Sequence, residues 1–302
     1  MERMLRANGI DICCEVFGKP TDPAVLLIAE LGQQGVGGPS RLCQRLATAG
    51  RHVVRYDARD TGRSTSFDFD RRPYTLADMA DDAVGVLDAL NIPAAHIVGC
   101  STGGMVAQEI AIGHPQRVRT LASLMSTPSV IDPASPTGYT GGLPAAAPQV
   151  QDLWAAREHR PAVTRDEHIA AALRYRRLVA TAGSFSERAE RSEQARQFDR
   201  ARDIAAAAHH DLAIVASEDR TARLAAIAVP SLVVHGSADP VLPYPHGIAI
   251  ASAISGARLL MLDGLAHSLP ETGALADCIL HALIAHTARD MPMPKMKPIK
   301  FF

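Results

Sequence analysis

The sequence predicts an α/β fold with a mostly parallel central sheet and helices on both faces. Short apolar runs alternate with longer segments of helical periodicity, and such alternation is typical of a parallel sheet. In one stretch, residues 94–104, an apolar run ends in a glycine-rich turn that leads directly into a helical segment, residues 103–113. Residues 128–219 interrupt the alternation with a segment rich in Pro, Gly and Ser that is followed by stretches of helical composition. We therefore expect a core domain of residues 1–127 and 220–290, a separate domain of residues 128–219 inserted into it, and a C-terminal tail of residues 291–302.

The glycine-rich turn contains a serine in the sequence Gly99-Cys100-Ser101-Thr102-Gly103. Glycines on both sides let neighbouring backbone pass closely, and a serine at a sharp strand-to-helix turn presents an exposed hydroxyl. The Thr102 N–H and the positive end of the following helix lie beside the place where an oxyanion would develop. Because this spacing also arises by chance, it becomes specific only together with an acid and a base farther along the chain.

Three further motifs accompany this turn: YDARDTGRS at residues 56–64, VVHGSADP with Asp239, and GLAHSLP with His267. Together with VGCSTGG they resemble the α/β-hydrolase superfamily, in which serine, acid and histidine follow one another in this order. Within that superfamily the sequence most resembles the aclacinomycin methylesterase-like group of polyketide-tailoring esterases. The resemblance covers about residues 1–126 and 225–289.

Composition and charge disfavour several classes of partner. The 31 basic and 32 acidic residues give a net charge of −1, and hence no electrostatic reason to expect nucleic acid or an anionic membrane. Five cysteines without a C-x-x-C spacing argue against a disulfide framework or a zinc site and favour a cytoplasmic location. No apolar run reaches the roughly 18 residues of a membrane span, and the N-terminus lacks a signal-peptide core. We expect a small-molecule ester substrate, no cofactor and no metal; the oligomeric state is left open.

The first elements expected are an opening pair of strands, residues 10–17 and 24–28, separated by a turn. In the resembled superfamily the second of these strands ends in His-Gly, and the next backbone N–H is an oxyanion donor. Here Ala29 and Glu30 occupy those places. Because the donor is a backbone group that any residue except proline supplies, the resemblance implies the Leu31 N–H as one donor.

Two interpretations of Glu30 stay open. It is either a structural charge, exposed to solvent or paired with an arginine, or an acid, base or recognition group in the substrate pocket; we favour the structural role. The loop that follows, residues 32–38, has four glycines but lacks the Lys-Ser/Thr of a phosphate-binding loop. A mobile pocket loop is the better interpretation.

The next elements expected are a helix at residues 41–49, a buried strand at 52–56 and an amphipathic helix that ends near residue 90. Thr75 and Asp78 have the spacing of a capping box, which marks the start of the amphipathic helix. In the polar turn of residues 57–64, we expect the side chains to bind one another and nearby backbone rather than take part in chemistry.

After the Ser101 turn we expect a helix at residues 103–113 and a buried strand at 118–125. Some lactonase-like members of the superfamily carry the catalytic acid directly after this strand, but residues 126–128 (STP) include no carboxylate. The acid must therefore come later in the chain.

In the resembled superfamily, an insertion after the sixth strand forms a helical cap domain over the nucleophile, so the resemblance implies such a cap for residues 128–219. This segment begins with a Pro- and Gly-rich approach. Helical composition then appears at residues 150–159, 165–180 and 186–204. The few large aromatic residues are candidate substrate contacts, although each such residue is more often part of a core. They are Trp154, Tyr175, Phe185 and Phe198. The histidines of this stretch lack the spacing with acidic partners that a metal site requires.

The sheet resumes at residues 230–235, and Asp239 follows in a turn at the strand end. A last strand at 258–262 precedes His267, and a closing helix is expected at 273–289. Four other histidines compete for the role of base: His96, His114, His235 and His281. Only His267 lies in the loop directly after the last strand, where the superfamily fold brings a histidine to the serine; His281 falls within the closing helix.

These residues and the resemblance imply a serine hydrolase that cleaves a carboxylic ester. Ser101 would attack, His267 would take and return the proton, and Asp239 would orient the imidazole. The Leu31 and Thr102 N–H groups would hold the oxyanion. The resembled subgroup implies a methyl ester of a bulky polyketide acid.

Two alternatives remain at this stage. An acyltransferase or thioesterase would use the same acyl-enzyme with a different acceptor or leaving group. A non-hydrolytic cyclase or binding scaffold would keep the fold without the chemistry; the changes at Ala29 and Glu30 favour it, and the intact Ser-Asp-His order opposes it. Haloalkane dehalogenases and epoxide hydrolases are disfavoured because their nucleophile is an aspartate.

Overall fold

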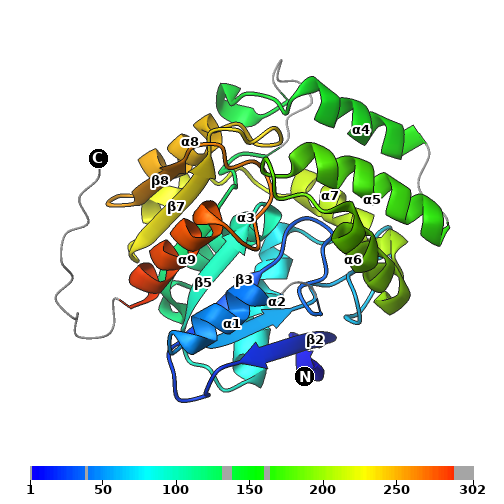
Figure 1. Ribbon diagram of the computed structural model, residues 1–302. Helices are drawn as coiled ribbons and strands as arrows, with labels where there is room; N and C mark the ends of the chain where they lie inside the picture. Colours follow the sequence, from blue (N-terminus) through cyan, green and yellow to red (C-terminus); the bar gives the residue numbers. More distant parts are fainter. Residues whose placement is uncertain (1, 38–39, 131–137, 160–163, 289–302) are drawn as a thin grey trace.

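The computed structural model describes residues 2–37, 40–130, 138–159 and 164–288. Within them an eight-stranded sheet forms the centre of the molecule, in the order β1-β2-β4-β3-β5-β6-β7-β8 (Figure 1). The strands are β1 (Glu2–Ala7), β2 (Ile10–Phe17), β3 (Ala24–Ile28), β4 (His52–Tyr56), β5 (Ala95–Cys100), β6 (Val118–Leu124), β7 (Ser231–Gly236) and β8 (Arg258–Leu262). Only β2 runs antiparallel to its neighbours β1 and β4, and the other neighbouring strands are parallel. The predicted α/β class is confirmed.

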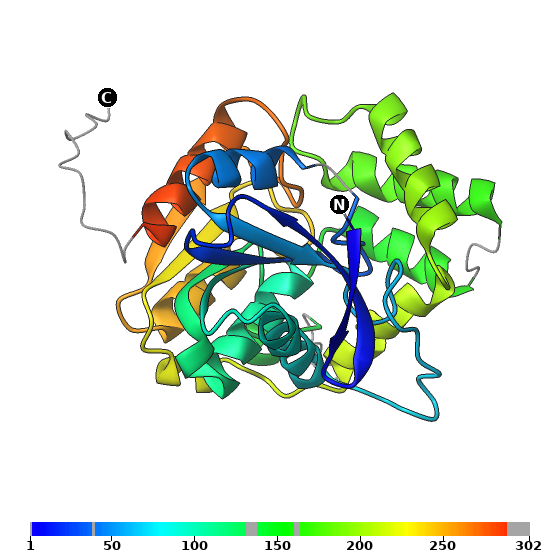
Figure 2. The same cartoon turned by 90° about the horizontal axis from the view of Figure 1, so that it is seen from below.

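Helices cover both faces of the sheet (Figures 1 and 2). One face packs against α1 (Arg41–Thr48) and α9 (Ala274–Thr287). The other face packs against α2 (Leu76–Ala89), α3 (Thr102–Gly113) and α8 (Pro245–Ala253). Consecutive strand residues point to opposite faces, so the central strands are buried on both sides and appear in the sequence as continuous apolar runs.

The opening strands differ from the expected pair. Strand β4 lies between β2 and β3, so the two are not neighbours in the sheet. The reason is that β3 and β4 are parallel and joined through α1, because parallel neighbours need a crossover connection. The sequence analysis also missed β1, the edge strand, whose exposed residues carry little apolar pattern.

Between β6 and β7 the chain forms a separate group of helices, which we call the inserted helices. They are α4 (Pro148–His159), α5 (Arg165–Val179), α6 (Glu187–Arg200) and α7 (His209–Val215). Figure 1 shows them gathered on one side of the sheet. Tyr139, Val150 and Val179 form a small core of this region with Val241 and Leu242, which follow β7. The helix expected to reach residue 204 ends at Arg200, and α7 was not predicted.

No helix among the described residues combines the length and the apolar character that crossing a membrane requires.

Candidate active site

Ser101 lies at the tight turn between β5 and α3, and its backbone is strained. It has φ 53° and ψ −120°, in the half of conformational space that residues with a side chain rarely adopt. A Cβ on Gly99 would lie 2.0 Å from the Gly103 carbonyl oxygen, and one on Gly103 would lie 2.3 Å from that of Ile28. Glycine is therefore required at both positions, as the sequence spacing indicated.

The structure brings Ser101, His267 and Asp239 together in one hydrogen-bonded chain. Ser101 Oγ lies 2.9 Å from His267 Nε2, and His267 Nδ1 lies 2.7 Å from Asp239 Oδ2. The other carboxylate oxygen of Asp239 accepts from the backbone N–H groups of Val241 and Leu242, each at 2.9 Å. All three side chains are buried. The chain therefore has the geometry of a nucleophile, a base and a group that orients the base.

The pKa shifts of the acid and the base match this arrangement. Burial alone would raise the pKa of Asp239, but the charge and hydrogen bond of His267 outweigh it and hold that pKa below its usual value. Burial likewise opposes the charged form of His267, but Asp239 outweighs it and raises the pKa of His267. Since a carboxylate only accepts, Nδ1 carries the proton and Nε2 is free to take one from the serine hydroxyl.

Two other residues near β7 and β8 do not join this chain directly. His235 is buried; its Nε2–H donates to the Leu242 carbonyl oxygen at 2.7 Å and lies 3.5 Å from Asp239 Oδ2. Asp263, a carboxylate that directly follows β8, accepts from the Ser237 hydroxyl at 2.7 Å in an exposed position. The carboxylate beside His267 is that of Asp239.

The two candidate oxyanion donors lie on adjacent backbone segments. Thr102 is the first residue of α3, where helical N–H groups have no partner within the helix. Leu31 follows β3, which pairs with β5 so that Ile28 is opposite Gly99. The close approach of Gly103 to the end of β3 brings the two segments side by side, next to the nucleophile.

Glu30 forms an ion pair that the sequence did not reveal. Its Oε2 lies 3.0 Å from Nη1 of Arg176 on α5, and the Cys100 thiol donates to Oε1 at 3.5 Å. Both charged side chains are mostly buried, with 19% and 16% of their surface exposed. Pairing with an arginine agrees with the structural interpretation of Glu30, and its place in the wall of a cavity agrees with the pocket interpretation, so both stay open. No local pattern could have identified Arg176, because it is distant in the chain.

A cavity of about 410 Å³ lies beside this ion pair. Its wall includes Glu30, Arg176, Cys100 and Ser268, together with parts of α1, α6 and α9. Cys100 and Ser268 are direct chain neighbours of Ser101 and His267. Ser101 and His267 themselves are not part of the described wall. The cavity therefore approaches the triad from one side, next to the nucleophile and the base.

The four candidate aromatic contacts lie in different surroundings. Phe185 lines the cavity and packs under the guanidinium of Arg177. Trp154 and Tyr175 pack against the small core of the inserted helices. The ring of Phe198 contacts that of His168, with centroids 5.6 Å apart. Among the described residues, only Phe185 of the four belongs to the cavity wall.

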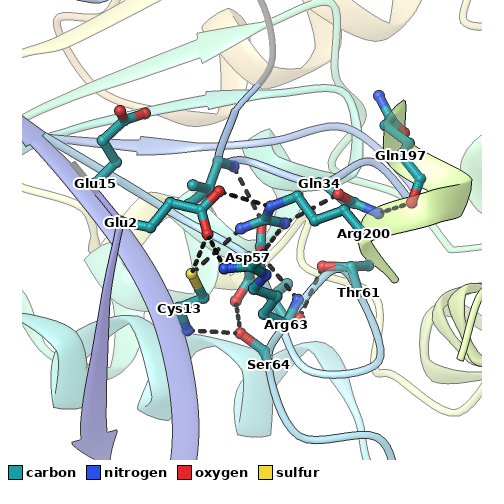
Figure 3. A network of polar contacts seen from close by, with 12 residues as sticks. Glu2, Cys13, Glu15, Gln34, Asp57, Thr61, Arg63, Ser64, Gln197 and Arg200 are labelled. Carbon is teal, nitrogen blue, oxygen red and sulfur yellow. Dashed lines mark hydrogen bonds and ion pairs between the residues drawn. The ribbon is translucent and has the colours of Figure 1, made fainter. Parts of the chain in front are cut away.

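The polar turn after β4 binds an arginine of α6 (Figure 3). Arg200 donates to Asp57 Oδ2 at 2.5 Å, to Glu2 Oε1 at 2.8 Å and to Gln34 Oε1 at 2.9 Å. Asp57 also accepts from the Arg63 backbone N–H at 3.1 Å. These contacts confirm the expectation that the polar residues of this turn bind one another and backbone groups. Through Arg200, these contacts also attach α6 to β1 and to the turn after β4.

Comparisons with known proteins agree with this geometry. Residues 28–274 match the family model for the alpha/beta hydrolase fold. The rhodomycin D methylesterase DauP of Streptomyces sp. (strain C5) is 32% identical over 94% of this chain and 97% of its own length. The rhodomycin D methylesterase DnrP of Streptomyces peucetius is 31% identical with the same coverage. The enol-lactonase from Burkholderia xenovorans LB400 shares the fold, with a TM-score of 0.73 at 22% identity over 94% of this chain and 99% of its own.

Proposed function

Since this chain belongs to the alpha/beta hydrolase fold family, we propose that it is a carboxylic ester hydrolase with Ser101 as its nucleophile. The observation that carries this proposal is the continuous hydrogen-bonded chain from Ser101 through His267 to Asp239. Similarity over nearly the whole chain to two methylesterases supports the same reaction class.

The reaction proceeds through an acyl-enzyme. As Ser101 Oγ bonds to the ester carbonyl carbon, its proton passes to His267 Nε2, and the carbonyl oxygen gains a negative charge. The Leu31 and Thr102 N–H groups donate to that oxygen. The C–O bond to the alcohol then breaks, and His267 gives its proton to the departing oxygen. Water, deprotonated by His267, releases the acid in the same way.

The substrate is a methyl ester of a bulky acid, in our proposal a polyketide. The two similar esterases are named for a methyl ester of rhodomycin D, which supports a small leaving group on a large acid. The cavity of about 410 Å³ beside the triad lies within the size range of small-molecule sites and would take the acyl body.

We also propose a cap domain and a cytoplasmic location, each supported by one observation. Contacts of α5, of α6 and of Thr181 between them with the loops after β3, β4 and β8 support the proposal that residues 128–219 form a cap domain over the site. The five cysteines are free thiols, which supports action in the reducing cytoplasm.

A panel of esters tests this function. The purified protein is assayed with methyl, butyl and long-chain acyl esters, including methyl esters of polycyclic aromatic acids, and Ser101→Ala is the control. We expect the highest kcat/KM on the bulky methyl esters and loss of turnover in Ser101→Ala. A maximum of kcat/KM on long-chain acyl esters would refute the proposed substrate. Faster acyl transfer to an added alcohol or thiol than to water would favour an acyltransferase. No turnover of any ester would favour a non-hydrolytic scaffold.

A further inference from the structure

The short loop after β3 carries the Leu31 N–H and has little backbone hydrogen bonding within itself; Gln33 and Gln34 bind Gln197 of α6. The only backbone hydrogen bond within its turn that the structure shows among the described residues joins the Gln33 N–H to the Glu30 carbonyl oxygen at 3.1 Å. Gly32 has φ +64° and lies against Ala207, next to α7. One hydrogen bond across the turn does not fix the orientation of the Leu31 N–H. Contacts from other segments must therefore fix it.

The Gly32 side of Leu31 is held by a histidine of α7. The Gly32 N–H donates to His210 Nδ1 at 3.2 Å, and His210 Nε2–H donates to the Arg59 carbonyl oxygen at 2.8 Å. Because a backbone N–H only donates and a carbonyl only accepts, these two contacts require one neutral tautomer. The ring is 2% exposed, and burial lowers the pKa of His210, which keeps it neutral. The hydrogen bond to Arg59 opposes this shift of the pKa, as do the charges of Asp60 and Asp211, but burial outweighs them.

The Glu30 side of Leu31 is held by α5. Arg176 bonds Glu30 Oε2 at 3.0 Å and also lies 3.5 Å from Glu190 Oε1 on α6, so its guanidinium bridges the loop and two inserted helices. Leu31 thus lies between two residues, each held by a side chain from the inserted helices.

We propose that His210 is a positioning residue for the oxyanion donor: by accepting the Gly32 N–H it fixes the peptide plane beside Leu31 and aims the Leu31 N–H at the developing oxyanion. This inference rests on the proposed ester hydrolysis. A donor that is misaligned binds the ground-state carbonyl about as before but stabilises the transition state less. The loss therefore appears in kcat more than in KM.

Two substitutions separate this role from packing. In His210→Asn the side-chain oxygen takes the place of Nδ1 and can still accept the Gly32 N–H. In His210→Gln the longer amide reaches the place of Nε2, so it can keep the bond to Arg59 but loses the one to Gly32. The neighbouring His209 also lies in α7 and bonds Asp60 at 3.1 Å, so His209→Gln is the matched control.

The variants are compared by kcat, KM, melting temperature and the affinity for a trifluoromethyl ketone, whose adduct carries an oxyanion. We expect His210→Gln to lower kcat about 10- to 100-fold with KM within about threefold. The affinity for the ketone should fall by a similar factor. His210→Asn should recover most of the loss, and His209→Gln should keep wild-type kcat.

Three results would overturn the proposal: an unchanged kcat in His210→Gln, an equal loss in His210→Asn, or a loss of kcat that follows the melting temperature across all three variants. Failure of the proposed function is a different result, because the wild-type protein would then turn over no ester. The two outcomes are therefore distinguishable.

Discussion

The acid role that we propose for Asp239 rests on its contacts as well as on its position in a motif. Its carboxylate accepts from His267 and from two backbone N–H groups, so one oxygen is fixed toward the imidazole. In Asp239→Asn the amide would favour the wrong tautomer of His267, and we expect kcat to fall by about 10³- to 10⁴-fold. Asp263→Asn, in an exposed position, should stay within about twofold. Steady-state kinetics decide, and a larger loss in Asp263→Asn would show that the wrong acid was chosen.

The charge of Glu30 should affect the pH profile. The base form of His267 is neutral, so kcat/KM rises with pH through the pKa of His267. Burial lowers the pKa of His267, and the charge and hydrogen bond of Asp239 more than offset this effect. The charge of Glu30 also raises this pKa, and the charge of Arg176 lowers it. Glu30→Gln should therefore move the acidic limb to lower pH, and Arg176→Gln should move it to higher pH. Glu187→Gln, at an exposed position of α6, is the control and should leave the pH profile unchanged. If the acidic limb also stays unchanged in Glu30→Gln and Arg176→Gln, Glu30 has a purely structural role.

At this scale the sequence predicted the triad but not its supporting residues. Ser101, Asp239 and His267 follow from their order and from the elements that precede them. Arg176 and His210 were missed, because an arginine or a histidine on a helix has many possible partners. Only the folded chain shows that these two meet the loop after β3.

Arg200 makes the most buried ion pair among the contacts that attach α6 to the core. Arg200 is 6% exposed and pairs with Asp57, which has no exposed surface (Figure 3). Removing one partner of a buried pair leaves the other charge uncompensated, so Arg200→Gln should lower the free energy of unfolding by about 3 kcal/mol. Arg191→Gln is the matched control, because that pair with Glu187 is exposed on the same helix and should cost less than about 0.5 kcal/mol. Urea denaturation measures both, and equal losses would contradict the anchoring role.

Regular elements were predicted best where their pattern is strong. The central strands are continuous apolar runs, and the capping box at Thr75 marks the start of α2, where the Thr75 N–H donates to Asp78 at 2.8 Å. Strand β1 and helix α7 were missed. Both are short, and their helical or extended state depends on packing against the rest of the chain rather than on local preference.

For the whole molecule, the fold class and the order of the core elements were predictable, but the placement of the inserted helices was not. The predicted core follows from motifs that lie at the ends of parallel strands, which meet at one edge of the sheet. The inserted helices lie outside the part of the sequence that the resemblance covers. Their position depends on long-range ion pairs such as Arg176–Glu30 and Arg200–Asp57. The cavity, formed between these helices and the sheet, could not be predicted for the same reason.

The proposed hydrolysis depends on an activated serine at Ser101. Incubation with a fluorophosphonate followed by peptide mass spectrometry measures this activation directly, because the reagent bonds to an activated serine and spares an idle one. We expect one adduct, on the peptide that contains Ser101, formed much more slowly in His267→Ala and absent in Ser101→Ala. An unlabelled Ser101 in the folded wild-type protein, or labelling that is equally fast in His267→Ala, would contradict the proposed activation.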